Sequence, residues 1–391
     1  MRLAIFTPFL YPFHVDMLAV ISGKAEVKIF TCGTYGNYPF KSLLRCAEVL
    51  KCIDILGDKL IGFFSISKFL RYKPKAVIIF GIESLAGLII YFISRLIRAK
   101  TLVIVEENNI TRLNNIVLEL LQIMKRGILR IVYERSPILV AESSASKKYV
   151  LEILHVKRKK PIIIRVHGVN ADRFGAFVSM PKQQAKKILQ KILRLPENLL
   201  KRKWYTFIGE LSYCKGADVL LDGIEILREI LKPNENVVFL LPKTRLLHDK
   251  KELRERYKRK LMRLVTNGSV ALYDPLRHED VPLLYRASDV IILPSRFLSY
   301  TSSDRAPNVA LEALASGTLL VASNVGGIPT IVGDAGIVVK PNDPYALATK
   351  LYQVLNNYEK YRSLEEKARQ RAISKLDIRH YSYALLELLK L

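Results

Sequence analysis

Short apolar runs alternate with helix-length segments along most of the chain, and this alternation constrains the fold more than any other feature. The runs are continuously apolar, which is typical of strands that are covered on both faces. Strands that alternate with helices predict parallel, doubly wound sheets and an α/β fold class. We expect strands at 3–9, 26–31, 76–81, 101–107, 138–143, 161–167, 204–210, 237–242, 270–274, 290–294, 318–323 and 336–340.

The pattern restarts after "GVNADRF", which predicts two domains of similar size. A chain of 391 residues is also too long for one ordinary core. We expect a first Rossmann-like domain at 1–171 and a second at 172–375, with a C-terminal helix at about 376–391 packing back on the first. Two such domains would face a central cleft at the carboxyl ends of their strands, where doubly wound sheets bind ligands.

The charge of the chain is strongly basic. It carries 62 Lys and Arg against 36 Asp and Glu, a formal net charge of +26. A field of this size attracts anions, whether phosphates, nucleic acid or an acidic membrane leaflet. The charge by itself does not choose among them, and a basic composition shared with the host is an equally simple explanation.

The four cysteines are interpreted as reduced and structural, because none forms a Cys-x-x-Cys pair and no histidine cluster accompanies them. We therefore predict no metal site. The first residues resemble a strand more than a signal peptide. The segment 76–97 is long enough to span a bilayer, but Gly81 and Glu83 interrupt it, which favours a strand, a turn and an amphipathic helix. The cysteines are Cys32, Cys46, Cys52 and Cys214.

The stretch "FIGELSYCKGADVLLDGI" combines a strand end, a loop and a helix start. The strand is expected to end at Gly209 and the helix to begin near Gly216. Lys215 would then lie beside the free N–H groups of the first helical turn, an arrangement that binds anions. Lys215 is either a clamp for a diphosphate or an ordinary surface lysine at a turn.

The stretch "DRAPNVALEALASG" places two carboxylates around a helix start. Pro307 fits the first helical turn, Asn308 can support it, and a glycine ends the apolar helix. Glu312 lies inside that helix, where a charge is costly unless it is paired. It could accept hydrogen bonds from a vicinal diol or pair with a cation. Asp304 in the preceding loop could face the same ligand.

The stretch from "PSRFLSYTSSDRAPNVALEALASG" to "PNDPYALATKL" resembles the C-terminal core of retaining GT-B glycosyltransferases of the family-4 type, also called glycosyl transferases group 1. Further matching segments follow the family's order. They are "ILVAESSASKKYVLEIL", "VHGVNADRF", "RLPENLLKRKWYTFIGELSYCKGADVLL" and "EDVPLLYRASDVIILPS". The likeness is strong at 204–351 and weak before residue 138.

The resemblance implies a GT-B fold and a retaining hexosyltransferase that uses a nucleotide-sugar donor, such as a UDP- or GDP-sugar, and no metal cofactor. It places Glu312 on the ribose hydroxyls, Asp304 near the donor sugar and Lys215 on the diphosphate. His14 is assigned to the catalytic group by its position alone. The other residues implied in donor binding are Pro307, Asn308, Val309, Gly209 and Glu210.

The chain departs from the family pattern at several of these positions. Asp304 is one methylene shorter than the usual Glu. Glu210 stands where the family has an Arg. The loop of His14 lacks the usual Gly pair, which allows close approach to a phosphate. Further departures are Glu106 and Glu107, the segment "FLLPK" and Thr330.

Two other functions remain open. The departures suggest a GT-B protein that binds or scaffolds without transferase activity. The charge suggests a nucleic-acid binder, but the basic runs at 157–160 and 249–263 lack interleaved stacking aromatics apart from Tyr257, and such runs are usually solvated helix faces. We regard nucleic acid as the weakest hypothesis.

A glycan or lipid-linked acceptor would give the basic surface a role. A cytoplasmic enzyme could attach peripherally to the cytoplasmic membrane face through basic, apolar helices of the first domain. The candidate docking residues are Arg95, Arg98, Lys125, Arg126 and Arg130.

Overall fold

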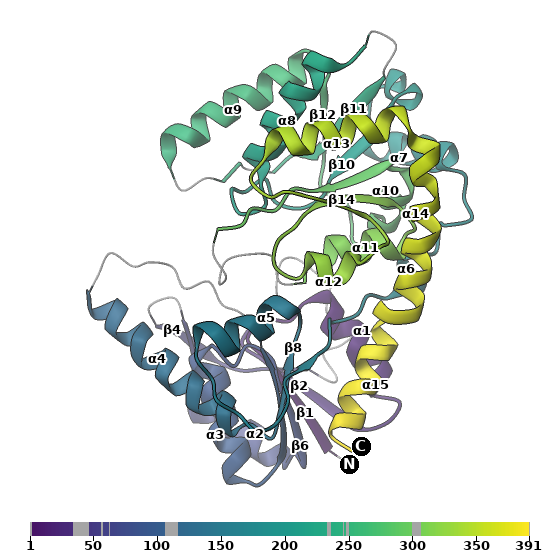
Figure 1. Cartoon of the computed structure of the whole chain (residues 1–391). Helices are drawn as coiled ribbons and strands as arrows, with labels where there is room; N and C mark the ends of the chain where they lie inside the picture. Colours follow the sequence, from purple (N-terminus) through teal and green to yellow (C-terminus); the bar gives the residue numbers. More distant parts are fainter. Residues whose placement is uncertain are drawn as a thin grey trace. The chain divides into compact units, whose positions relative to one another are not determined.

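The chain divides into two compact units in a computed structural model (Figure 1). The first contains residues up to Gly168 and the C-terminal segment from Ile378, and the second contains Val169–Ser299 and Ala306–Asp377. The structure describes residues 2–33, 47–55, 58–61, 63–105, 116–232, 236–244, 246–247, 250–298 and 306–390.

The first unit is built on a parallel sheet in the order β3-β2-β1-β6-β7-β8-β9. Each pair of neighbouring strands is parallel, beginning with Leu3 opposite Val27 on one side and Ala76 on the other. A small antiparallel pair, β4 and β5, lies outside this sheet. The strands are β1 (Arg2–Thr7), β2 (Glu26–Thr31), β3 (Ala47–Val49), β4 (Cys52–Ile55), β5 (Asp58–Ile61), β6 (Ala76–Ile79), β7 (Lys100–Val105), β8 (Ile138–Ala141) and β9 (Ile163–Ile164).

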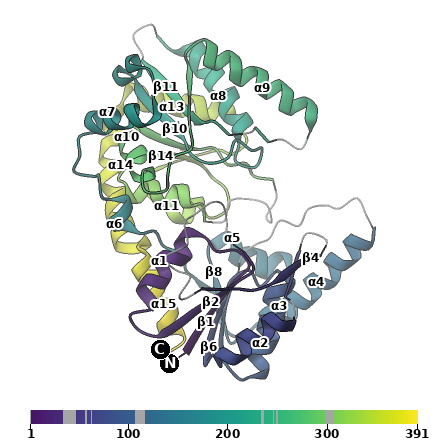
Figure 2. The ribbon, with the colours of Figure 1, turned by 180° about the vertical axis from the view of Figure 1, so that it is seen from behind.

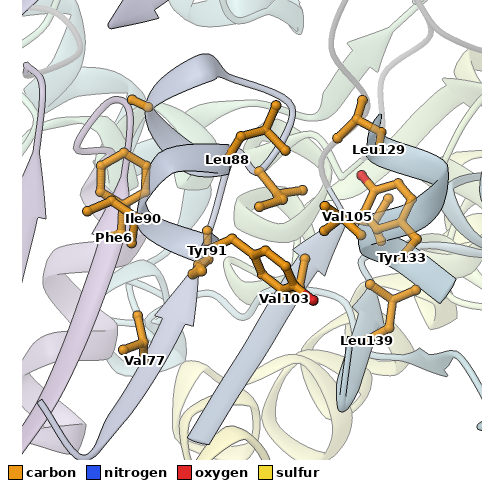
Figure 3. Close-up of a cluster of buried hydrophobic side chains, with 14 of the residues drawn as sticks. Phe6, Val77, Leu88, Ile90, Tyr91, Val103, Val105, Leu129, Tyr133 and Leu139 are labelled. Atoms are coloured by element: carbon orange, nitrogen blue, oxygen red, sulfur yellow. The ribbon is translucent and has the colours of Figure 1, made fainter. Parts of the chain in front are cut away.

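Helices cover both faces of this sheet, as the continuously apolar strands predict. Consecutive residues of one strand, such as Ile5 and Phe6, are buried in two different hydrophobic cores. In Figure 3, strand residues Phe6 and Val103 lie with Tyr91 of α3 and Tyr133 of α4. The helical segments are α1 (Pro12–Ile21), α2 (Phe63–Tyr72), α3 (Leu85–Leu96), α4 (Ile116–Arg135), α5 (Ser144–Lys148), the π-helical turn η2 (Tyr149–Ile153) and α15 (Ile378–Leu388).

The C-terminal helix belongs to the first unit. α15 lies beside α1, and both views of the ribbon show the two helices together (Figure 2). Tyr381 and Leu385 of α15 are buried with Met17 and Ile21 of α1 in the core on that face. The last segment therefore completes a core that begins at the other end of the chain.

The second unit has a parallel six-stranded sheet in the order β12-β11-β10-β13-β14-β15. Alternate residues of its strands again enter different cores, with Tyr205 on one face and Trp204 on the other. The strands are β10 (Lys203–Phe207), β11 (Val237–Pro242), β12 (Val270–Tyr273), β13 (Val290–Leu293), β14 (Leu319–Ser323) and β15 (Ile337–Val339).

The helices of the second unit are distributed over both faces of its sheet. α8, α9 and α13 contribute to the core that contains Tyr205, and α7 and α10 to the core that contains Trp204. The segments are α6 (Ala171–Phe174), α7 (Lys182–Leu193), the 3₁₀ turn η3 (Glu197–Lys201), α8 (Ala217–Ile230), α9 (Lys251–Thr266), α10 (Val281–Ala287), α11 (Asn308–Ala315), α12 (Ile328–Val332), α13 (Pro344–Asn356), α14 (Tyr358–Arg371) and the π-helical turn η4 (Ala372–Leu376).

The strand order determines where each unit can bind a ligand. In the second sheet the chain runs outward from β10 through β11 to β12, then returns to β13 on the other side of β10. The first sheet has the same reversal between β1 and β6. The carboxyl ends beside such a switch point are the usual binding edge of doubly wound sheets. The α/β class with parallel, doubly wound sheets is confirmed.

The expectation of reduced cysteines is wrong for one pair. Cys32 and Cys52 form a disulfide, with Cα atoms 5.6 Å apart. Cys32 follows β2 and Cys52 begins β4, so the fold brings together two residues that no sequence motif connects. Cys214 is a free, exposed thiol, and Cys46 lies outside the described residues.

The apolar segment at 76–97 forms β6, a turn and α3, as expected. Within the described part of the chain, no helix is both long and apolar enough to cross a membrane.

Candidate functional site

The candidate site in the second unit begins where the loops after β10 and β13 meet. Gly216 has a φ of +71°, and a β-carbon there would overlap the carbonyl oxygen of Pro294. Only glycine permits both the left-handed conformation and this close approach. The backbone N–H of Arg296 then donates to the carbonyl of Cys214 at 3.0 Å. Lys215, between these contacts, is held at the carboxyl edge of the sheet.

Glycine is also favoured at the start of the same loop. Gly209 lies two residues after the buried end of β10 and has a φ of +119°, in the region that favours glycine. A β-carbon there would have no neighbour within 4 Å, so the backbone is open on that side. Glu210 next to it is exposed. A carboxylate therefore occupies the position where the resemblance implies an arginine.

A second cation lies against this loop. The guanidinium of Arg296 donates to Oδ2 of Asp218 at 2.5 Å and lies 4.5 Å from the ring centre of Tyr213. Burial is the main influence on Asp218 and raises the pKa of its carboxyl, while Arg296 opposes the shift. Sequence reasoning missed this pair, although Arg296 follows the strand end "VIILPS".

α11 supplies the carboxylate of this site. The helix begins at Asn308, with Pro307 as the residue before it, so the first-turn N–H groups belong to Asn308 and Val309. Glu312 lies one turn further and is half-buried. The Tyr285 hydroxyl donates to Oε2 of Glu312 at 2.7 Å. This tyrosine was not predicted as a site residue.

Tyr285 is a permanent donor to this carboxylate. Its side chain is fully buried. Burial, and next the negative charge of Glu312, raises the pKa of Tyr285 well above its usual value. The phenol therefore stays protonated near neutral pH and keeps donating to Glu312.

One predicted site residue cannot be placed. Asp304 lies outside the described residues, and its role stays a prediction; Glu106 and Glu107 also lie outside them. Among the residues that the structure describes, no group of three or more His, Cys, Asp or Glu side chains could hold a metal ion.

His14 lies at the carboxyl edge of the first sheet, at the start of α1. Its Nδ1 accepts from the backbone N–H of Tyr11 at 3.0 Å, so Nε2 carries the proton of the neutral ring. Burial, and secondarily His167, lowers the pKa of His14 well below its usual value. Within the described segments, Nε2 has no hydrogen-bond partner. In this form neither ring nitrogen can act as a general base, because Nδ1 already accepts a hydrogen bond and Nε2 carries the proton.

The aromatic ring of Phe13 links His14 to a second buried histidine, His167. The Phe13 ring lies 4.0 Å from that of His14 and 4.4 Å from that of His167, measured between centroids. Nδ1 of His167 is 3.2 Å from Oε1 of Glu142, and both side chains are buried. Glu142 follows β8 and His167 follows β9. Their positions at predicted strand ends were the available signal, and sequence reasoning missed them.

Residues 189–371 match the family model described as glycosyl transferases group 1. The chain carries a group 1 glycosyltransferase domain. Every residue of the site in the second unit, from Gly209 to Glu312, lies inside the matched range.

Curated relatives of this glycosyltransferase domain share part of their length with the chain. The D-inositol 3-phosphate glycosyltransferase of Corynebacterium efficiens is 32% identical over 165 residues, which cover 41% of this chain and 36% of the relative. The O-antigen chain mannosyltransferase B of Escherichia coli is 37% identical over 79 residues, covering 20% of this chain and 19% of the relative. The first relatives are matched over 36% to 47% of their length.

Solved structures resemble the whole chain in fold. Anabaena Alr3699/HepE in complex with UDP has a TM-score of 0.74 at 15% identity and covers 100% of both chains. A glycosyltransferase from Rickettsia africae has a TM-score of 0.72 at 17% identity and covers 100% of this chain and 97% of that one. The predicted GT-B fold is confirmed, and the predicted group 1 match is confirmed for residues 189–371.

Proposed function

We propose that the chain transfers a hexosyl group from a nucleotide sugar to an acceptor hydroxyl with retention of the anomeric configuration. The observation that carries the proposal is the strand order of the second sheet. Lys215 lies in the loop after β10, α11 with Glu312 follows β13, and these two strands are neighbours inside the group 1 domain. A lysine and helix N–H groups suit a diphosphate, and a carboxylate suits a vicinal diol.

Each group has a distinct role in this proposal. Glu312 accepts hydrogen bonds from the ribose hydroxyls. The N–H groups of Asn308 and Val309, with Lys215, bind the diphosphate. Arg296 adds positive charge beside the loop where Glu210 replaces the family's arginine. Asp304 is assigned to the donor sugar, as the resemblance implies.

The reaction breaks the bond between the anomeric carbon and the diphosphate oxygen, which leaves with the electron pair. The acceptor oxygen bonds to the same carbon from the face that the diphosphate leaves. The acceptor proton passes to a departing phosphate oxygen. Catalysis then rests on positioning and on stabilising the charge of the diphosphate. UDP is a reasonable first donor nucleotide, because Anabaena Alr3699/HepE was solved with UDP and with UDP-glucose.

Nucleotide binding and donor hydrolysis test the proposal. We expect UDP, GDP or ADP to raise the melting temperature and one of the matching nucleotide sugars to be hydrolysed. Glu312→Ala should lower the affinity for that nucleotide at least tenfold, because the substitution removes charge-assisted hydrogen bonds. Glu229→Ala, an exposed carboxylate on α8, is the matched control and should bind normally. Equal affinity in Glu312→Ala and the wild type would refute the site.

A binding or scaffold role is the second candidate function. It is favoured by Glu210, which replaces a positive charge with a negative one near the expected diphosphate. Stabilisation by none of the three nucleotides would support it over transfer. Retention is tested with any accepted acceptor, because the coupling of the product's anomeric proton distinguishes the two configurations.

We further propose that the first unit docks on an anionic membrane that carries the acceptor. α3 and α4 cover the same face of the first sheet and expose large apolar side chains among arginines. Leu96 is 83% exposed beside Arg95 and Arg98, and Ile131 is 49% exposed beside Arg130. Exposed apolar side chains that lie between cations are typical of interfacial helices.

Co-sedimentation with vesicles tests this docking surface. The full chain should bind vesicles that contain phosphatidylglycerol and not those of phosphatidylcholine alone. Leu96→Ser combined with Ile131→Ser should reduce binding, whereas Met262→Ser, an exposed apolar position on α9 of the other unit, should not. Equal binding to neutral and anionic vesicles would refute the proposal.

A further inference from the structure

The hydroxyl of Tyr285 on α10 and the carboxylate of Glu312 on α11 are joined by a hydrogen bond of 2.7 Å, although 27 residues separate them. We propose that Tyr285 is a positioning residue, whose hydroxyl holds the Glu312 carboxylate in the orientation that binds the ribose hydroxyls of the donor. This inference rests on the proposed function and adds to it a residue that does not itself touch the nucleotide.

The Tyr285 ring is fixed from several sides. Its side chain is fully buried. The ring meets that of Phe174 edge to face, with centroids 5.8 Å apart and an interplanar angle of 81°. Its backbone carbonyl accepts from Oγ1 of Thr318 at 2.9 Å and from the N–H of Ser288 at 3.1 Å. The hydroxyl is therefore presented at one place.

This fixed hydroxyl matters because Glu312 is only half-buried and its side chain has several rotatable bonds. A carboxylate that must bind two hydroxyls at once gains affinity when its orientation is set before the ligand arrives. An ionised carboxylate has about four acceptor sites, and Tyr285 occupies one of them at Oε2.

Tyr285→Phe removes the hydroxyl and keeps the packed ring. We expect about a tenfold loss of affinity for whichever of UDP, GDP or ADP stabilises the wild type, because the lost bond is charge-assisted. Tyr257→Phe is the matched control in the same unit, because the Tyr257 hydroxyl also donates to a carboxylate, Oδ2 of Asp222, at 3.2 Å. This control should keep wild-type affinity.

Two further measurements separate positioning from a merely structural role. With the 2′,3′-dideoxy analogue of the same nucleotide, the wild type and Tyr285→Phe should bind equally, since the hydroxyls that Glu312 would bind are absent. In a Glu312→Ala background, Tyr285→Phe should cause no further loss. A general packing defect would lower the affinity for both nucleotides, and its loss of affinity would add to the loss caused by Glu312→Ala.

The outcomes distinguish this inference from the proposed function. If Glu312→Ala loses affinity and Tyr285→Phe does not, the positioning role is wrong and the donor site stands. If Tyr285→Phe weakens the natural and the dideoxy nucleotide equally, the hydroxyl is structural and the inference is again wrong. If no nucleotide binds the wild type, both the proposed function and this inference fall.

Discussion

A β-carbon at position 216 would lie 2.7 Å from the carbonyl carbon of Pro294 and would overlap its oxygen. The loops that follow β10 and β13 are therefore packed backbone against backbone. Lys215 and Arg296 take their places from this contact, so a single glycine controls how the two loops of the candidate donor site meet.

We predict that Gly216→Ala destabilises the second unit by about 3 kcal/mol or more and also weakens nucleotide binding. Two effects make the substitution unfavourable: alanine would have to adopt a left-handed backbone conformation, and its β-carbon would overlap the Pro294 carbonyl. Gly268→Ala is the matched control, because Gly268 has a φ of +73° and open space around its would-be β-carbon. That control should cost only about 1–2 kcal/mol. Denaturant midpoints measure both, and equal losses would contradict the packing argument.

A buried ion pair in the second unit gives another prediction. Lys186 Nζ lies 2.6 Å from Oδ2 of Asp289, and each side chain is 5% exposed. Asp289 also accepts from the backbone N–H of Trp204 at 2.8 Å. Lys186→Met should cost about 3–5 kcal/mol of unfolding free energy, because it leaves a buried carboxylate without its close partner.

Two variants serve as controls for this ion pair. Lys186→Met with Asp289→Asn should recover part of the loss, because the asparagine is neutral and still accepts from Trp204. Arg362→Ala removes a pair with Glu359 in which both side chains are mostly exposed, and should cost less than about 1 kcal/mol. A loss from Lys186→Met as small as that from Arg362→Ala would contradict the prediction.

The stability of the first unit should fall as the pH drops below about 6.5. The folded pKa of His14 lies well below the unfolded value of about 6.5, so the unfolded chain binds a proton that the folded chain refuses. The contribution is fully present above the unfolded pKa and declines at lower pH, by up to about 1.4 kcal/mol per pH unit.

Denaturant midpoints between pH 5 and pH 8 measure this slope. His14→Asn keeps an acceptor for the Tyr11 N–H and should flatten the slope, even if it lowers stability at pH 8. His380→Asn, at an exposed position on α15, is the control and should keep the wild-type slope. An unchanged slope in His14→Asn would show that other groups carry the pH dependence.

The disulfide between Cys32 and Cys52 predicts a redox-dependent stability. Alkylation under denaturing conditions should label these two cysteines only after reduction, whereas Cys214 should react without it. Replacing both cysteines with serine should cost about 2–4 kcal/mol, because the bond constrains the unfolded chain. Mass spectrometry of the labelled peptides decides the pairing. Equal labelling before and after reduction would exclude it.

Much of the fold could be predicted because its causes are local. Continuous apolar runs produced parallel strands covered on both faces, and the amphipathic segments between them produced the covering helices. The start of α11 was also predictable, because proline and asparagine are favoured at helix starts. Pro307 is the residue before the helix, and Asn308 is its first residue. Glu312 was identified for a local reason as well, since a charged residue inside an apolar helix requires a partner.

The partners of the site residues were beyond the sequence. Tyr285 lies 27 residues before Glu312, Asp218 lies 78 before Arg296, and Glu142 lies 25 before His167. Periodicity shows which face of an element is buried, but not which other element covers it. Strand order decides that, and both sheets reverse their order beside the first strand of the unit.

The sequence by itself therefore determined the α/β architecture, the group 1 motifs and the glycines and carboxylates near the strand ends. Only the tertiary structure decided that a buried tyrosine holds Glu312, that Arg296 lies beside the loop of Lys215, and that Cys32 pairs with Cys52. The physical reason is the range of the forces involved. Backbone preference and amphipathicity act within a few residues, whereas a hydrogen bond or disulfide forms wherever the folded chain brings two groups together.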